Sequence, residues 1–159
     1  MLLLSNADVE QVLTMAACIE AREAIVHEIA RGDAVGSGRS DVYTPSAHPD
    51  APFHRLASMT GASRARGYAC ARVMSDMVGW AGVGGSRRED KRAGRPGRWC
   101  GLLFLYATAT GEPLAIIHDG VAQHMRVGAG AGVGARILAR PDSETLGMIG
   151  SGGMAHSYL

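Results

Sequence analysis

Apolar positions in the first 32 residues form a short run and then a helical pattern. Residues 1–4 predict a short strand, and Ser5 is typical of a helix N-cap because its hydroxyl oxygen can accept a free backbone N–H. Between residues 14 and 31, apolar residues recur near helical spacing with charged residues between them, and Gly32 suits a C-terminal cap. The pattern predicts an amphipathic helix packed against a sheet.

The hydrophobic pattern is lost in the next segment and returns later as a strand pattern. Residues 33–52 carry Gly, Ser, Asp and Pro without periodicity and predict a loop, in which Val42 and Tyr43 could form a short strand. From residue 67 to residue 80, alternate positions differ in character. This segment therefore predicts a strand on which Arg72 projects among apolar neighbours.

Residues 86–98 form a basic segment, with six lysine and arginine residues against Glu89 and Asp90. Its glycines and proline, and the lack of interleaved aromatic residues, favour a solvated surface loop over a nucleic-acid contact. The net charge of +1 also predicts no sustained attraction to nucleic acid or to an anionic membrane.

Two apolar runs, residues 100–107 and 113–118, are separated by a turn that contains Gly111, and they predict adjacent antiparallel strands. Residues 121–140 predict a helix, although its four glycines each cost about 1 kcal/mol relative to alanine. Two explanations remain open. Either the bare backbone lets a cofactor or a neighbouring element approach closely, or the segment is a loop.

A short apolar run at residues 145–149 suits a buried parallel strand and leads directly into G-S-G-G-M-A. This is the G-x-G-x-x-A spacing of dinucleotide-binding turns. The first glycine permits a tight turn, the second lets a pyrophosphate approach the backbone, and the alanine allows close helix packing. A glycine turn in a small domain is the alternative. The motif consists of Gly150, Ser151, Gly152, Gly153, Met154 and Ala155.

Length and composition predict one ordinary globular core, since 47% of the 159 residues are hydrophobic. The cysteines, Cys18, Cys70 and Cys100, are odd in number and lack C-x-x-C spacing, so neither a disulfide framework nor a metal site is predicted. No apolar run approaches the roughly 18 residues of a membrane span. We therefore expect a cytoplasmic protein without a membrane segment.

Three consecutive segments resemble the ornithine cyclodeaminase/mu-crystallin family in order and spacing: G-E-P-L-A-I-I-H-D-G, Q-H-M-R-V-G-A, and L-A-R-P-D-S-E-T-L-G-M-I-G-S-G-G-M-A. The resemblance is strong over residues 102–155 and looser upstream. It implies an α+β N-terminal domain, with a mixed or antiparallel sheet and helices, that leads into the first strand of a truncated Rossmann α/β domain. Residues 1–140 would then form a substrate-binding and dimerisation domain, and residues 141–159 the incomplete start of an NAD(P)-binding domain.

The resemblance also implies roles for individual residues. Family members grip the substrate carboxylate with cationic side chains, which implies this role for Arg126, Arg72 and Arg39. Arg72 stands where the family usually has a lysine, and Val127 where it usually has a threonine that can contact nucleotide phosphates. Asp119 falls at a strand-to-helix junction, where capping is the simpler role.

The family further implies a homodimer that uses NAD or NADP and acts on an amino or imino acid. The leading expectation is ornithine cyclodeaminase chemistry, in which NAD takes hydride from the α-carbon of a basic amino acid and ammonia leaves as a ring closes. Imine reduction, amino-acid dehydrogenation and non-catalytic, mu-crystallin-like binding remain alternatives. The family's catalytic aspartate is expected beyond Leu159, so the 159 residues alone are expected to be inactive.

Overall fold

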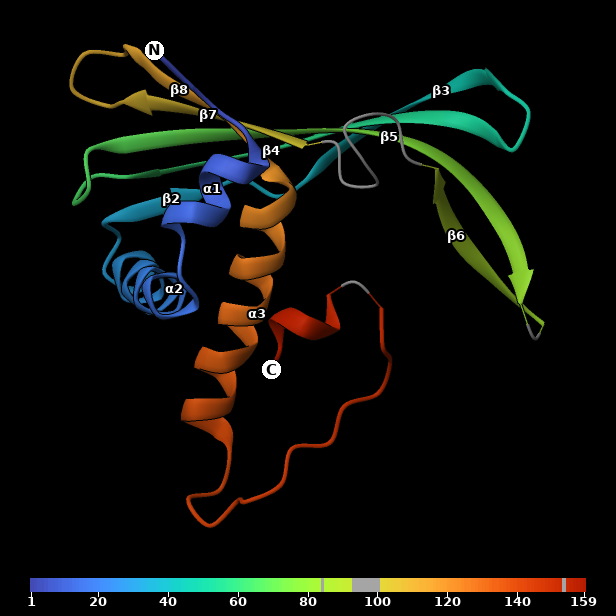
Figure 1. Cartoon of the computed structure of the whole chain (residues 1–159). Coiled ribbons are helices and arrows are strands. Elements are labelled where there is room, and N and C mark those ends of the chain that lie inside the picture. Colours follow the sequence, from blue (N-terminus) through green and yellow to red (C-terminus); the bar gives the residue numbers. More distant parts are fainter. Residues whose placement is uncertain (84, 93–100, 153) are drawn as a thin grey trace.

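The computed structural model describes residues 1–83, 85–92, 101–152 and 154–159, and it is built on an eight-stranded sheet (Figure 1). The strand order is β1-β8-β7-β5-β4-β2, with β3 beside β4 and β6 beside β5. β1 and β8 run parallel, and the remaining described pairs are antiparallel. The elements are β1 (Leu2–Leu4), α1 (Asn6–Val12), α2 (Met15–Ala30), β2 (Ala34–Gly36), β3 (Ser40–His48), β4 (Ala51–Ser63), β5 (Tyr68–Val83), β6 (Ser86–Arg92), β7 (Gly101–Ala107), β8 (Pro113–His118), α3 (Asp119–Leu138) and the 3₁₀ turn η1 (Ala155–Ser157).

The long strands β4 and β5 form the middle of the sheet and extend it into a curved arm (Figure 1). Along its outer edge, each of these two long strands pairs with two shorter strands. β2 and β3 both pair with β4, whereas β7 and β6 both pair with β5. The arm therefore consists of the far ends of β4 and β5 together with β3 and β6, and the helices lie at the opposite end of the molecule.

The helices cover one face of the sheet (Figure 1). α1 begins with a capping box, in which Ser5 Oγ accepts from the Asp8 N–H at 3.3 Å and the Asp8 carboxylate accepts from the Ser5 N–H at 2.8 Å. α2 packs against α3, where a Cβ at Gly132 would lie 3.6 Å from Ile19 Cδ1. The glycines of α3 thus lie in a helix, and at this position the bare backbone allows close approach of a neighbouring helix.

A buried carboxylate joins the end of α2 to the turn between β4 and β5. Glu28 accepts a hydrogen bond from Ser63 Oγ at 2.6 Å and one from Arg66 Nε at 3.0 Å. Glu28 and Ser63 are both buried. Because an unpaired buried carboxylate is costly, these contacts stabilise the attachment of the helical layer to the sheet.

Several predictions of fold are confirmed. The chain is α+β, and the strands of the predicted hairpin, β7 and β8, lie inside the strand order rather than at its edges. Residues 1–4 contain β1, residues 67–80 lie almost wholly in β5, and the glycine-rich helix is α3.

Three segment predictions are wrong. The loop predicted over residues 33–52 is mostly strand, namely β2, β3 and the start of β4, because β4 offers backbone partners that stabilise a strand without hydrophobic periodicity. Only the possible strand at Val42 and Tyr43 is confirmed, since both lie in β3. Residues 86–92 form β6 on the edge of β5, while the rest of the predicted loop, residues 93–98, lies outside the described residues. Residues 145–149 are separate from the N-terminal sheet as predicted, but they form no strand, since no described strand pairs with them.

Candidate functional site

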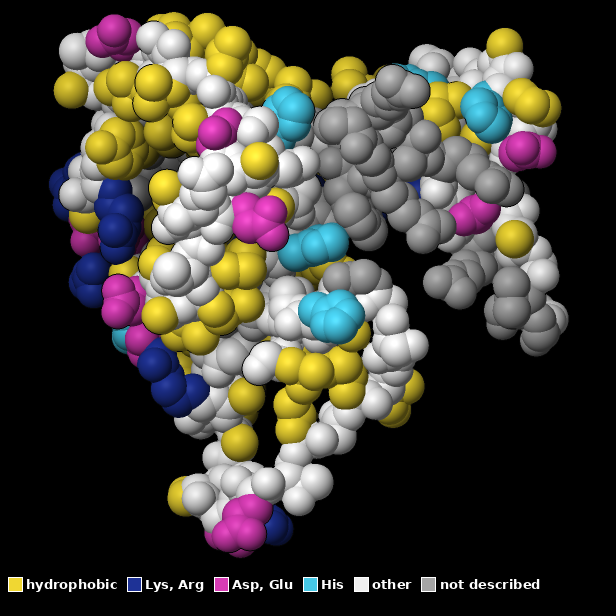
Figure 2. Space-filling view, in the orientation of Figure 1, with side chains coloured by type: hydrophobic (Ala, Val, Ile, Leu, Met, Phe, Trp, Pro, Cys, Tyr) yellow, Lys and Arg dark blue, Asp and Glu magenta, His cyan; other side chains and the backbone are white. Residues whose placement is uncertain are grey.

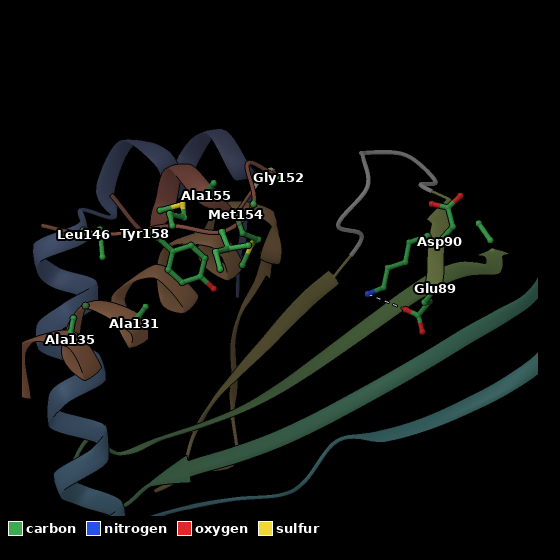
Figure 3. A pocket seen from close by; sticks show the side chains of 16 residues that line it. Glu89, Asp90, Ala131, Ala135, Leu146, Gly152, Met154, Ala155 and Tyr158 are labelled. Atoms are coloured by element: carbon green, nitrogen blue, oxygen red, sulfur yellow. Dashed lines mark ion pairs between the residues drawn. The ribbon is translucent and has the colours of Figure 1, made fainter. Parts of the chain in front are cut away.

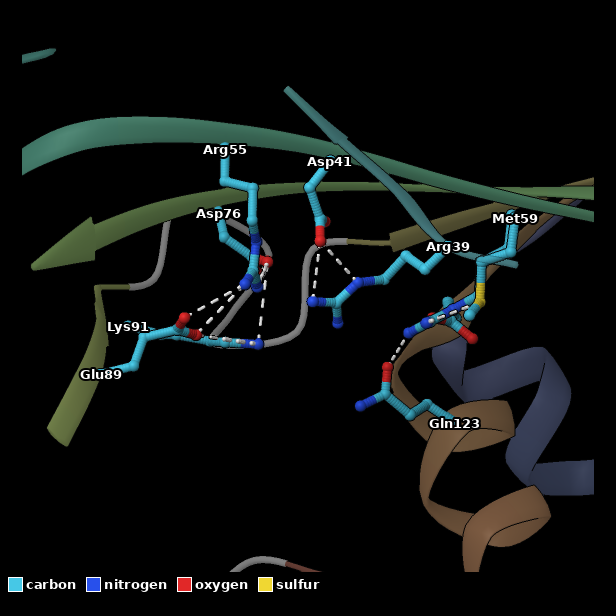
Figure 4. A network of polar contacts seen from close by, with 10 residues as sticks. Arg39, Asp41, Arg55, Met59, Asp76, Glu89, Lys91 and Gln123 are labelled. Carbon is cyan, nitrogen blue, oxygen red and sulfur yellow. Dashed lines mark hydrogen bonds and ion pairs between the residues drawn. The ribbon is translucent and has the colours of Figure 1, made fainter. Parts of the chain in front are cut away.

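Arg72 and Asp119 form a buried ion pair where the sheet meets α3. Arg72 Nε donates to Oδ2 of Asp119, the first residue of α3, and Arg72 Nη2 donates to Oε1 of Gln123 one turn further along the helix (Figure 4). Met59 is the cross-strand partner of Arg72 and places its Sδ 3.8 Å from Nη1. The guanidinium is therefore fixed relative to both the sheet and the helix.

The backbone of β7 makes room for the Asp119 carboxylate. A Cβ at Gly101 would lie 2.7 Å from Asp119 Oδ2, so a larger residue at this position would collide with the carboxylate. The predicted capping role is wrong: His118 is the N-cap residue of α3, and the Asp119 side chain turns to Arg72 instead. The carboxylate is needed there because Arg72 brings a positive charge into the interior.

Burial raises the pKa of Asp119, and the attraction of Arg72 opposes this rise. Asp119 is 1% exposed, and its Oδ1 has no hydrogen-bond partner among the residues that the structure describes. One carboxylate oxygen therefore serves Arg72, and the other is unsatisfied.

Arg126 lies on the same face of α3 as Asp119 and Gln123, because these residues are separated by helical steps of three and four. It is half-buried, and burial together with the nearby charge of Arg72 lowers its pKa. Within the described part of the chain, no carboxylate forms an ion pair with Arg126. The structure thus brings Arg72 and Arg126 together as predicted, with a positive charge in excess.

Arg39 stands apart from this pair. Its guanidinium binds Asp41 at 2.9 Å near the start of β3, and 43% of its side chain is exposed (Figure 4). The strand register brings it to the neighbourhood of Met59, since Ser40 pairs with Ser58. No contact in the described structure joins Arg39 to the other two predicted arginines.

The glycine motif borders a cavity of about 980 Å³ between α3, the C-terminal segment and the arm (Figure 3). Gly150 has a φ of +102°, which glycine adopts readily and other residues rarely do. Gly150, Gly152, Met154 and Ala155 line the cavity; Ser151 is exposed, and Gly153 lies outside the described residues. The opposite walls come from small residues of α3 and from the arm, namely Ala131, Gly132, Ala135, Ala81, Glu89, Asp90 and Lys91.

The cavity and the arginines lie on different faces of α3. Ala135 follows Arg126 by nine residues, which is about two and a half turns of a helix, so the two residues lie on opposite faces. The structure therefore does not bring the predicted cofactor-binding residues to the predicted carboxylate-binding residues.

Two residues near Arg126 were missed by the sequence reasoning. Gln123 hydrogen-bonds to Arg72, and Arg22 of α2 lies close enough for its charge to lower the pKa of Arg126. The helical spacing of Asp119, Gln123 and Arg126 was a usable signal for Gln123. Arg22 gave no such signal, because its proximity depends on how α2 packs against α3.

The described residues contain neither a metal-binding cluster nor a membrane-spanning helix. Histidine, cysteine and acidic side chains form no group there that could hold a metal ion. The described helices include none that is long and apolar enough to cross a membrane.

The fold of the chain is similar to that of several solved structures. An archaeal alanine dehydrogenase dimer with bound NAD is 25% identical, with a TM-score of 0.76 over 99% of this chain and 43% of that one. A lysine cyclodeaminase is 23% identical, with a TM-score of 0.71 over 99% and 44%. A probable ornithine cyclodeaminase from Bordetella pertussis Tohama I is 24% identical, with a TM-score of 0.64 over 89% and 37%. The chain thus spans less than half the length of these proteins.

A search of curated protein sequences finds no match. The family profile described as the ornithine cyclodeaminase/mu-crystallin family matches residues 1–159, which is the whole chain. The chain therefore belongs to the ornithine cyclodeaminase/mu-crystallin family.

Proposed function

We propose that Arg126, with Arg72 beside it, binds the carboxylate of an amino or imino acid substrate. The observation that carries this proposal is the half-buried Arg126 guanidinium, which forms no ion pair with a carboxylate among the described residues; Asp119 attracts it but is paired with Arg72. A substrate carboxylate would supply the missing negative charge and accept hydrogen bonds from the planar guanidinium. Arg39 is the third proposed contact, and it would have to leave Asp41 to take part.

We further propose that the glycine motif holds the pyrophosphate of NAD or NADP. The residues fit this group: Gly150 takes a positive φ, and a Cβ at Gly150 or Gly152 would have no neighbour within 4 Å, so the backbone is open to a ligand. When bound, this cofactor would supply hydride-transfer chemistry at the α-carbon of the substrate. The arginines hold the substrate carboxylate, and the motif holds the cofactor.

The proposed reaction is hydride transfer at the α-carbon of an amino acid or of its imine. Cyclodeamination of a basic amino acid, the leading expectation from the sequence, is the first candidate, and the solved lysine cyclodeaminase supports it by similarity. Amino-acid dehydrogenation is the second, supported by the similarity to the alanine dehydrogenase. Because the chain spans less than half of each, we expect the 159 residues alone not to turn over either substrate.

We also propose a cytoplasmic homodimer. Cys18 and Cys70 are free thiols, as is common in a reducing compartment. The sheet face opposite the helices carries exposed apolar side chains, among them Leu102, Leu56 and Val42, which are suited to contact with a second copy.

The carboxylate-binding proposal predicts that Arg126→Ala weakens binding of L-alanine and L-ornithine to the chain. Loss of a half-buried charged partner should cost about 2 kcal/mol, which is roughly 30-fold in Kd. Isothermal titration calorimetry measures the change. Arg140→Ala is the matched control, since Arg140 is 80% exposed beyond the end of α3 and its ion pair among the described residues is with Asp142, which is 74% exposed.

The control variant should bind both amino acids like the wild type, and both variants should keep the wild-type melting temperature. Unchanged binding in Arg126→Ala, or no binding by the wild type, would remove Arg126 from the proposed site.

A further inference from the structure

Arg22 lies against α3 one turn beyond Arg126. A Cβ at Gly130 would lie 3.4 Å from Arg22 Nη2 and 3.5 Å from its Nε, so the missing side chain lets the guanidinium lie on the helix backbone. Gly130 follows Arg126 by four residues and therefore shares its face of α3. Arg22 and Arg126 are thus neighbours, which agrees with the lowering of the Arg126 pKa by the Arg22 charge.

The Arg22 guanidinium has no partner among the described residues. Its Nε is buried and donates no hydrogen bond. Glu23, the next residue on α2, pairs with Arg136 instead. Arg22 itself is only part-buried, so its Nη groups, rather than the buried Nε, are the donors that an oxyanion could reach, and such a group would be stabilised by charge-assisted hydrogen bonds.

The positive charges beside α3 outnumber the negative charge of Asp119 by more than one ligand carboxylate could offset. Arg22, Arg72 and Arg126 interact electrostatically along one side of α3, and Asp119 is the carboxylate that pairs with Arg72. One substrate carboxylate would offset one of the two remaining positive charges. A second anionic group on the same ligand would offset the other.

We propose that Arg22 binds a second carboxylate of the ligand, so that the site takes a dicarboxylic amino or imino acid. This inference rests on the proposed function, in which Arg126 holds the first carboxylate. A side-chain ammonium, as in ornithine, would be repelled by Arg22, whereas a side-chain carboxylate would be attracted. The inference therefore favours dehydrogenation or imine reduction over cyclodeamination of a basic amino acid.

The test compares ligands that differ only in side-chain charge. Calorimetric titration with L-aspartate and L-asparagine should give a Kd at least 10-fold lower for L-aspartate, and L-ornithine should bind more weakly than either. Arg22→Gln should abolish the preference by weakening L-aspartate alone. Arg31→Gln, at the exposed end of the same helix, is the matched control and should keep the preference.

The outcomes separate this inference from the proposed function. Equal binding of L-aspartate and L-asparagine by the wild type, tighter binding of L-ornithine, or an unchanged preference in Arg22→Gln would overturn it. If inorganic phosphate competes with L-aspartate but asparagine binds as tightly as aspartate, the two arginines form a phosphate site and the proposal is wrong. When the proposed function and this inference are both correct, Arg126→Ala should weaken binding of every amino acid tested. Arg22→Gln should still bind L-asparagine like the wild type.

Discussion

Arg72 and Asp119 place opposite charges in the interior, and each depends on the other. Arg72→Met would leave the Asp119 carboxylate buried without its partner, at a cost of about 3 to 5 kcal/mol in unfolding free energy at neutral pH. The double variant R72M/D119N should recover most of this loss, because neither charge remains. Urea unfolding of wild type, single and double variants measures it.

The loss of unfolding free energy in Arg72→Met should grow as pH rises. Burial already raises the Asp119 pKa above 3.8, and removal of Arg72 should raise it further. The folded Arg72→Met variant then keeps a proton that the unfolded chain has released. Its unfolding free energy should therefore fall as pH rises from about 4 to 8, relative to the double variant. A cost that is independent of pH, or one that the double variant retains, would show that the pair does not control this region.

The sequence singled out Arg72 and Arg126, which the structure places close together, but not the neighbours that surround them. The two arginines could be found because each lies in a recognisable segment of the family. The role of Asp119 could not be predicted from the neighbouring sequence, since both capping and ion pairing suit an acidic residue at a strand-to-helix junction. The ion pair forms because Arg72, on the distant strand β5, lies against Asp119. Arg22 lies 104 residues before Arg126, so only the packing of α2 on α3 reveals it.

At the scale of elements, the glycines of α3 differ in how much space surrounds them. A Cβ at Gly134 would meet nothing within 4 Å, whereas a Cβ at Gly128 would overlap the carbonyl of Ser157 in η1. Gly134→Ala should therefore raise the unfolding free energy by about 0.4 to 1 kcal/mol through helix propensity. Gly128→Ala should gain nothing, because η1 must move away from the helix.

Hydrogen exchange separates these two effects. The N–H groups of Ala155 and Ser157 donate to the carbonyls of Gly152 and Met154, just before η1, so their exchange reports whether this turn stays in place. Faster exchange in Gly128→Ala, with wild-type exchange in Gly134→Ala, is the expected result. Equal exchange in both variants would contradict the packing of η1 on Gly128.

The elements that sequence reasoning missed are those with weak periodicity of their own. β2 and β3 depend on the edge of β4, and β6 depends on that of β5, so their stability comes from backbone pairing. At residues 145–149 the sequence predicted a strand that the structure does not form, because no described strand lies beside this segment to pair with it. Strong local patterns, such as those of α2, β7 and β8, were predicted because their own residues specify them.

At the scale of the whole molecule, one face of the sheet is covered by helices and the other is not. The register places Leu102 opposite Val73 and Leu56 opposite Ser75, on the face away from Arg72. On the same face, Leu3 adjoins Ile116 near the strands β1, β7 and β8, where Figure 2 shows hydrophobic side chains gathered. An uncovered apolar face of this kind predicts association.

The proposed dimer therefore predicts that Leu102→Asp makes the chain monomeric. A charge in an apolar interface would be desolvated without a partner. Leu138→Asp, at the exposed end of α3, is the control and should leave the dimer intact. Size-exclusion chromatography with light scattering distinguishes the outcomes: a monomeric wild type, or a dimeric Leu102→Asp variant, contradicts an interface on this face.

Binding of a substrate carboxylate by Arg126 and Arg72 is tested most directly by guanidinium NMR of the ¹⁵N-labelled chain. Titration with L-alanine should shift the Nε–Hε signal of Arg126 saturably, with the Kd that calorimetry gives. L-alaninamide, which has the same shape without a carboxylate charge, should leave the signal in place. An Arg126 signal that does not move with L-alanine, or that moves equally with L-alaninamide, would contradict the claim.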